Sequence, residues 1–158
     1  LWRKCNHALG VLLSGGEFDI HSTARCATGR IHLPNKMYIH YPMLRQANNG
    51  FEYIRRASEY RKVNKGVDAD WTNIYGGKVT ENIVQALAAL VIREQMAAAG
   101  LVYPLAFQVH DEIIITAPED KAENAQDALI RIMSTPPKWA PDLPVACEAG
   151  YAVNYGDT

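Results

Sequence analysis

The sequence predicts an α+β protein in which an antiparallel sheet and a β-hairpin pack on amphipathic helices. Apolar residues recur at three- and four-residue steps in some segments, which is the period of a helix. Other segments are short runs rich in β-branched residues and bounded by Gly, Pro and Asn, which is typical of strands joined by turns. The two kinds of segment alternate without repeats or linkers, and 158 residues suit one domain. We therefore expect a single domain over residues 1–158.

The N-terminal third is predicted to contain a helix and then a hairpin. A helical stripe followed by Ser14-Gly15-Gly16 predicts a helix and linker over residues 1–27; the stripe comprises Trp2, Cys5, Ala8, Leu9 and Leu12. Thr28-Gly29-Arg30 is typical of a turn, and two short β-rich runs follow it, so residues 28–42 are predicted to form a hairpin. Residues 43–76 are polar, and their pattern does not resolve into elements.

The C-terminal half is predicted to alternate helices with strands. Residues 80–99 lack Gly and Pro and carry an apolar stripe, which predicts a helix with Thr80 as its N-cap and Gly100 as its C-cap. Two β-rich runs on either side of a polar centre predict a hairpin over 105–117. A helix is expected over 119–134, after Pro118, and a last strand over 144–153.

Composition restricts the class of protein. Hydrophobic residues make up 48% and charged residues 21%, as in soluble globular proteins, and no uninterrupted apolar stretch approaches the roughly 18 residues of a membrane span. Three widely spaced cysteines argue against a disulfide framework and favour a reducing compartment such as cytoplasm. No signal peptide is evident, and a chain that begins with Leu1 is expected to be a processed chain, an excised fragment or a chain whose numbering was restarted.

Charge is unevenly distributed along the chain. The net charge is −1, although nucleic-acid-binding proteins usually carry a basic surface. The segment 55–65 holds five cations against the single acid Glu59. Such a segment is either a solvated helix face or a surface that contacts phosphates, and the sequence leaves both interpretations open.

The tetrapeptide Val109-His110-Asp111-Glu112 lies between the two strands of the predicted hairpin. Adjacent acids between β-branched runs repel each other and lose hydration, so a cation is expected nearby. Mg²⁺ suits this position, because it takes oxygen ligands and is usually held by one or two carboxylates together with substrate phosphates. A solvent-facing hairpin turn, in which Asp and Glu are ordinary, is the alternative explanation.

A longer set of motifs resembles the C-terminal palm of family A DNA polymerases, the DNA polymerase I-like enzymes of phages and prophages. Residues 75–86 read YGGKVTENIVQA and precede a helix, which VHDE at 109–112 follows. Residues 31–42, IHLPNKMYIHYP, are similar to the preceding hairpin of those enzymes, and Trp2 is similar to a helix tryptophan. The resemblance covers nearly the whole chain and implies the end of the fingers and the C-terminal half of the palm, with its antiparallel sheet.

This resemblance implies template-directed addition of deoxynucleotides to a primer 3′ end by two-metal nucleotidyl transfer with Mg²⁺. Asp111 matches the palm aspartate that helps to hold the metals, and Glu112 matches the auxiliary acid beside it. His110 matches a histidine that touches the primer terminus. Gln85 matches a glutamine that hydrogen-bonds the minor groove, whose acceptors an amide can contact almost without regard to sequence.

Lys78 and Arg93 are further candidates, for phosphate contacts. The expected partners are primer-template DNA and deoxynucleoside triphosphates, in a bacterial cell or a phage-infected host, with no membrane. The family's other metal-binding aspartate and its fingers lysine and tyrosine have no match in this sequence. The chain alone is therefore expected to be inactive and to need a second chain or a missing segment. Two alternatives are a noncatalytic DNA-binding palm remnant and a metal-dependent phosphohydrolase built on His110 and Asp111.

Overall fold

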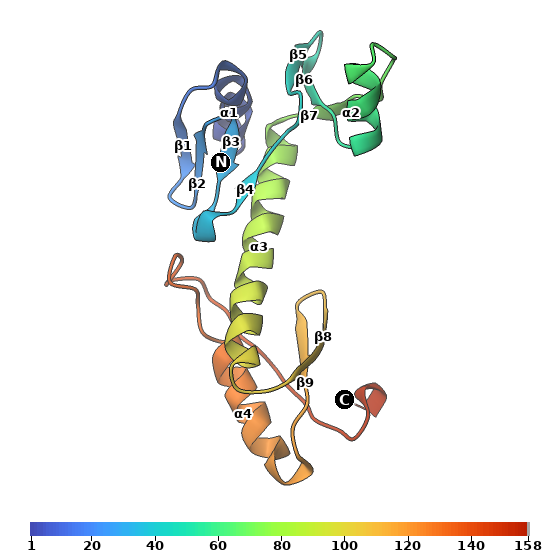
Figure 1. The fold of residues 1–158 in the computed structure, drawn as a ribbon. Helices are drawn as coiled ribbons and strands as arrows, with labels where there is room; N and C mark the ends of the chain where they lie inside the picture. Colours follow the sequence, from blue (N-terminus) through green and yellow to red (C-terminus); the bar gives the residue numbers. More distant parts are fainter. Residues whose placement is uncertain (158) are drawn as a thin grey trace. The chain divides into compact units, whose positions relative to one another are not determined.

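The computed structural model describes residues 1–157 and confirms an α+β fold with antiparallel sheets. The chain divides into two compact units, Leu1–Leu87 and a second unit that begins at Ala88, where the sequence predicts one domain. The boundary falls inside helix α3 (Gly76–Gly100, Figure 1). At 25 residues this helix is long enough for its two halves to pack against different elements.

Helix α1 (Trp2–Ser14) opens the first unit and confirms the predicted helix. Its three- and four-residue apolar spacing buries Cys5, Ala8, Leu9 and Leu12 on one face. Gly15 ends the helix with a φ of 73°, and the Gly16 N–H donates to the Val11 carbonyl at 3.0 Å. This is the left-handed C-terminal cap that glycine adopts without steric cost.

A four-stranded antiparallel sheet follows in the order β1-β2-β3-β4, made of Phe18–His21, Ala24–Ala27, Arg30–His32 and Tyr38–Ile39. The predicted turn at residues 28 and 29 is confirmed, since both have positive φ angles of 51° and 71° between β2 and β3. Strands β1 and β2 occupy a segment that was predicted to be linker, and that prediction was wrong. Ile20 and Cys26 lie in the core of this unit, so the alternation in this short segment was the missed signal.

The segment that the sequence left unresolved forms a second sheet, β5-β6-β7, and helix α2. These elements span Arg45–Ala47, Gly50–Tyr53, Thr72–Ile74 and, for α2, Ala57–Asn64. Glu59 is the buried acid of α2; its Oε2 accepts the Asp70 N–H at 2.8 Å and its Oε1 lies 2.9 Å from Lys62 Nζ. The Asp70 N–H and then Lys62 lower the pKa of Glu59. One of the five cations of this basic segment therefore has a structural partner.

Helix α3 begins at Gly76 and not at Thr80, so the predicted N-cap was wrong. The Thr80 hydroxyl donates to the Gly76 carbonyl at 2.8 Å, one turn back inside the helix. The start is fixed by tertiary contact instead, because the Gly76 N–H donates to Asn6 Oδ1 at 3.2 Å. Further along the first unit, Asn82 donates to the Tyr41 hydroxyl at 3.0 Å.

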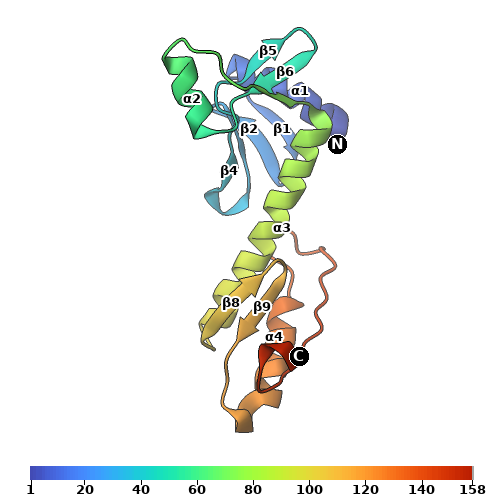
Figure 2. The same cartoon turned by 90° about the vertical axis from the view of Figure 1, so that its right-hand side faces the viewer.

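The second unit holds the rest of α3, a hairpin of two strands and helix α4 (Figure 2). The hairpin consists of β8 (Leu105–Val109) and β9 (Glu112–Ile115), and a short turn, η2 (Glu119–Lys121), precedes α4 (Ala122–Met133). The hairpin and the two helices confirm the predicted elements. Gln95 of α3 is buried, and its amide donates to the Met133 carbonyl at 2.6 Å. Trp139 donates to Glu94 at 2.7 Å.

No strand forms over 144–153, so the prediction of a last strand was wrong. This segment contains Ala146, Ala149 and Gly150, residue types that are depleted in strands. A side chain holds it in place of a backbone ladder, since the Gln126 amide donates to the Ala149 carbonyl. A short turn, η3 (Tyr155–Asp157), follows.

By length and composition, α3 could also cross a membrane: its most apolar 18-residue window has a mean hydropathy of 1.2, and 28% of that window is buried. It is the one helix of residues 1–157 with this property. Core helices of soluble proteins meet the same two criteria, so this property is weak support for a membrane role. The expected absence of a membrane partner stays a prediction.

Candidate functional site

The hairpin β8–β9 presents the predicted acidic motif at its tip. Val109 pairs with Glu112 across the hairpin, so His110 and Asp111 form the two-residue connection. His110 has a φ of 51°, a left-handed conformation in which His is enriched among non-glycine residues. The Gln108 amide donates to the His110 carbonyl at 2.7 Å and so fixes the turn. Three candidate residues are thus adjacent and exposed: His110, Asp111 and Glu112.

The base of the hairpin is anchored in the second unit. Ile113 follows Glu112 and is 5% exposed, so the two residues point to opposite faces of β9. Ala125 and Leu129 of α4 are buried too, and they line the same cavity as Ile113. A register slip of one residue would exchange Glu112 with Ile113 and bury a carboxylate, so this packing determines which acid reaches solvent.

Strand β8 is exposed along its whole length, on both faces. Phe107 is 45% exposed, and Leu105 and Val109 are 39% and 36% exposed. An isolated two-stranded hairpin is marginally stable in water and normally packs a face on another layer. Within residues 1–157, therefore, the strand that leads to the acidic tip leaves the apolar side chains of Leu105, Phe107 and Val109 incompletely covered.

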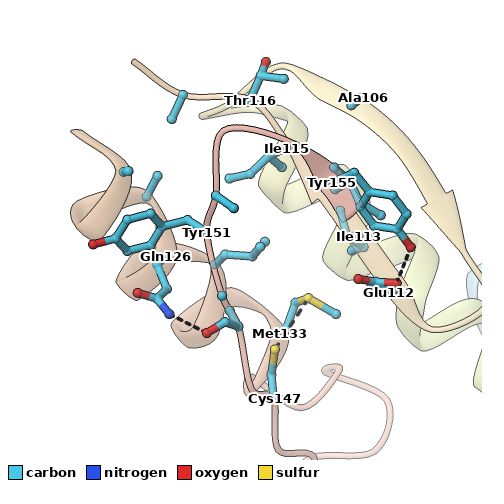
Figure 3. Close-up of a pocket in the computed structure, with 18 of the residues that line it drawn as sticks. Ala106, Glu112, Ile113, Ile115, Thr116, Gln126, Met133, Cys147, Tyr151 and Tyr155 are labelled. Atoms are coloured by element: carbon cyan, nitrogen blue, oxygen red, sulfur yellow. Dashed lines mark hydrogen bonds between the residues drawn. The ribbon is translucent and has the colours of Figure 1, made fainter. Parts of the chain in front are cut away.

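A tyrosine that the sequence analysis did not single out contacts the motif. The Tyr155 hydroxyl donates to Glu112 Oε2 at 3.2 Å, as the close-up in Figure 3 shows. Its ring meets that of Phe107 edge to face, with centroids 5.1 Å apart. The Glu112 carboxylate raises the pKa of the Tyr155 phenol, because it accepts the phenol's proton in a hydrogen bond. No local pattern around Tyr155 indicates this contact, since 43 residues separate it from Glu112.

The other candidate residues lie on α3. Lys78 Nζ lies 2.8 Å from both carboxylate oxygens of Glu81, and the Gln85 amide donates to Glu81 Oε1 at 3.4 Å. The structure thus brings Lys78 and Gln85 together around one acid on an exposed face. Arg93 is exposed on the part of α3 that belongs to the second unit. Lys78 and Gln85 belong to the first unit and the hairpin motif to the second.

Comparison with known proteins gives one informative match. A segment of 86 residues is 37% identical to a protein named DNA polymerase from Bacillus phage SP02. The chain is related to a phage DNA polymerase. The match covers 52% of this chain and 12% of the phage protein, so the chain spans about an eighth of that relative. No family model matches, and no solved structure matches.

The chemistry of the hairpin tip fits part of a magnesium site. Asp111 and Glu112 supply carboxylate oxygens, the ligand type that Mg²⁺ prefers, and both face solvent. Across residues 1–157 no group of three or more His, Cys, Asp or Glu side chains is arranged to hold a metal. A two-metal centre at this tip would therefore need further ligands from water, from nucleotide phosphates and from protein outside the described residues.

Proposed function

We propose that this chain is the C-terminal palm portion of a family A DNA polymerase, and that Asp111 is one of the carboxylates of its two-metal active site. The observation that carries the proposal is an exposed Asp-Glu pair at the tip of a tight antiparallel hairpin, in a chain related to a phage DNA polymerase. A hairpin tip places a carboxylate beyond its own core, where a substrate and further ligands can reach it.

Each candidate residue has a distinct role in this proposal. Asp111 holds the metals, and Glu112 is the auxiliary acid beside it. His110 contacts the primer terminus. Gln85 hydrogen-bonds the minor-groove edge of the nascent pair, where its amide can both donate and accept. Mg²⁺, when bound, would lower the pKa of the primer 3′ hydroxyl and neutralise the negative charge on the nucleotide phosphates.

Lys78 is the weaker of the two candidates for phosphate contact. Its ammonium is already paired with Glu81 at 2.8 Å, at a site where both side chains are nearly half exposed. An exposed pair of this kind contributes little to stability, so phosphate could replace Glu81 at small cost. Arg93 is exposed and forms no ion pair within residues 1–157, which leaves its guanidinium available for a phosphate oxygen.

The active site is completed by protein that this chain lacks. Two metals need more carboxylates than the tip supplies, and the chain covers a small fraction of its phage relative. The exposed apolar strand β8 supports the same idea, because a further element or partner chain would cover Phe107 and its neighbours. We propose that the chain polymerises DNA only together with a segment or a second chain that carries the missing aspartate and the fingers.

Primer extension tests this function. The chain alone, with primed template, Mg²⁺ and deoxynucleotides, should give no extension, and a complete polymerase containing it should extend the primer. Asp111→Ala in the complete protein should lower extension by at least about a thousandfold, roughly 4 kcal/mol of transition-state stabilisation, and leave primer-template affinity within about threefold.

Asp127→Ala is the matched control, because Asp127 is an exposed acid on α4 in the same unit. It should leave extension unchanged. Full extension by the Asp111→Ala enzyme would refute the proposed site, and extension by the chain alone would refute its dependence on further protein. Phosphate release from simple esters without DNA would instead favour a phosphohydrolase.

A further inference from the structure

We propose that Tyr155 is a positioning residue, which holds the Glu112 carboxylate and, through it, the hairpin tip that carries Asp111. This inference rests on the proposed function and adds a residue far along the chain to the same site. Its hydroxyl donates to Glu112 Oε2 at 3.2 Å, and its ring packs on Phe107 at 5.1 Å between centroids. Tyr155 therefore contacts both strands of the hairpin: its hydroxyl contacts Glu112 of β9, and its ring contacts Phe107 of β8.

The segment that carries Tyr155 is tethered at successive points along its length. Cys147 Sγ lies 3.8 Å from Met133 Sδ at the end of α4, and the Gln126 amide donates to the Ala149 carbonyl. Figure 3 shows these contacts and the Tyr155–Glu112 hydrogen bond as dashed lines between residues that line the cavity. The segment thus runs from α4 to the hairpin and joins the two.

A turn at the end of this segment holds the backbone at Tyr155. The Asp157 N–H donates to the Asn154 carbonyl at 3.1 Å, and the Asn154 amide donates to Asp157 Oδ2 at 3.2 Å. These two bonds close the turn η3, whose first residue is Tyr155. Holding a tyrosine costs little entropy, because its side chain has only two rotatable angles before the ring.

The need for a positioning residue follows from the rest of the site. Beneath the tip lies a cavity of about 780 Å³, which β9, α4 and the segment 146–155 line together. Ile113 is buried at the base of the hairpin, but β8 is exposed throughout and the hairpin borders this cavity, so the tip beyond Ile113 has little packing of its own. A misplacement of about 1 Å can cost a hundredfold in rate, so a contact from outside the hairpin has a clear use.

Fluorine NMR on the chain itself tests the contact independently of activity. Labelling with 3-fluorotyrosine gives eight resonances for the eight tyrosines, and Tyr155→Phe identifies its own by loss. We expect Glu112→Ala to shift the Tyr155 resonance and Asp127→Ala to leave it in place. A Tyr155 resonance that is the same in the Glu112→Ala chain and in the wild type would overturn the proposal.

Single-turnover incorporation by the complete polymerase tests the role. Tyr155→Phe keeps the ring contact with Phe107 and removes only the hydroxyl, and we expect the maximal rate to fall about tenfold with primer-template affinity unchanged. Tyr151→Phe is the control, since Tyr151 is an exposed tyrosine of the same segment. In a Glu112→Ala background, Tyr155→Phe should change the rate by less than about twofold, because the two groups act as a pair.

The outcomes separate this inference from the proposed function. If Tyr155→Phe and wild type incorporate nucleotide at the same rate while Asp111→Ala is inactive, the function stands and the positioning role is refuted. Equal losses from Tyr155→Phe in the wild-type and Glu112→Ala backgrounds would also refute it, because the hydroxyl would then act elsewhere. If Asp111→Ala stays active, the proposed site itself fails.

Discussion

Gly76, at the start of α3, lies in close contact with the backbone of α1. Replacing it by Ala should destabilise the first unit. A Cβ at this position would lie 2.6 Å from the Trp2 carbonyl oxygen and 2.8 Å from both the backbone N and the Cβ of Asn6. Ordinary contacts of a Cβ begin at about 3.4 Å. Two of these atoms belong to the backbone, so no rotamer change relieves the overlap, and the two helices must separate.

The magnitude follows from three contributions. Overpacking of a fitted contact costs about 1–3 kcal/mol, and weakening the hydrogen bond from the Gly76 N–H to Asn6 Oδ1, now 3.2 Å, costs about 1 kcal/mol more. Ala improves helix propensity over Gly by up to about 1 kcal/mol, which offsets part of the loss. We expect Gly76→Ala to lower the free energy of unfolding of this unit by about 1–3 kcal/mol.

Thermal unfolding followed by far-ultraviolet circular dichroism measures this effect. For a unit of this size, about 2 kcal/mol corresponds to a fall in Tm of roughly 8–16 °C. Gly10→Ala is the matched control, because a Cβ at Gly10 of α1 meets nothing within 4 Å, and Tm should rise slightly. Gly77→Ala should lie between them, since its nearest neighbour is the Tyr75 ring, which can rotate. Equal melting temperatures for Gly76→Ala and Gly10→Ala would refute the reasoning.

Three further predictions concern buried groups. Burial raises the pKa of Tyr41 to about 12, so the folded state favours the neutral phenol. Its contribution to the free energy of unfolding should be complete below pH 10 and should fall by up to about 2–3 kcal/mol as pH rises through 12, as urea unfolding would measure. Gln95→Ala should cost about 1–3 kcal/mol in the same assay, because the Met133 carbonyl loses its partner. Burial raises the pKa of the Cys26 thiol to about 11 and also raises the pKa of the Cys147 thiol, but Cys147 is only half-buried. Iodoacetamide at pH 8 should therefore alkylate Cys147 first and Cys26 more slowly, as peptide mass spectrometry would show.

Much of the fold could be predicted because the apolar residues of the long helices recur every three or four positions, which is the period of a helix. The stripe on α1 is the best example, since Cys5, Ala8, Leu9 and Leu12 are all buried at helical spacing. Failures occurred where local signals competed with tertiary contacts. Thr80 has the chemistry of an N-cap, yet α3 starts at Gly76 because the missing Cβ allows close contact with α1.

The candidate site was predictable only where its residues are adjacent in sequence. His110, Asp111 and Glu112 form one motif, and the turn between two β-rich runs places them together. Tyr155 begins the short turn η3, which follows the irregular segment 144–153, and no periodicity connects it with the hairpin. Contacts of this kind depend on how an irregular segment crosses its neighbours, which propensity and pattern do not specify.

The exposure of the acidic tip lessens the electrostatic need for a cation that the sequence predicts there. Adjacent carboxylates between β-branched runs are costly when they are desolvated, but Asp111 and Glu112 are both exposed here. Water screens them, so the described part of the chain has no electrostatic need for a metal at this position. The need would arise when another element covers β8 and brings its own carboxylate to the tip. Metal affinity and assembly should therefore be coupled, with Mg²⁺ binding weakly to the chain alone and more tightly to the completed site.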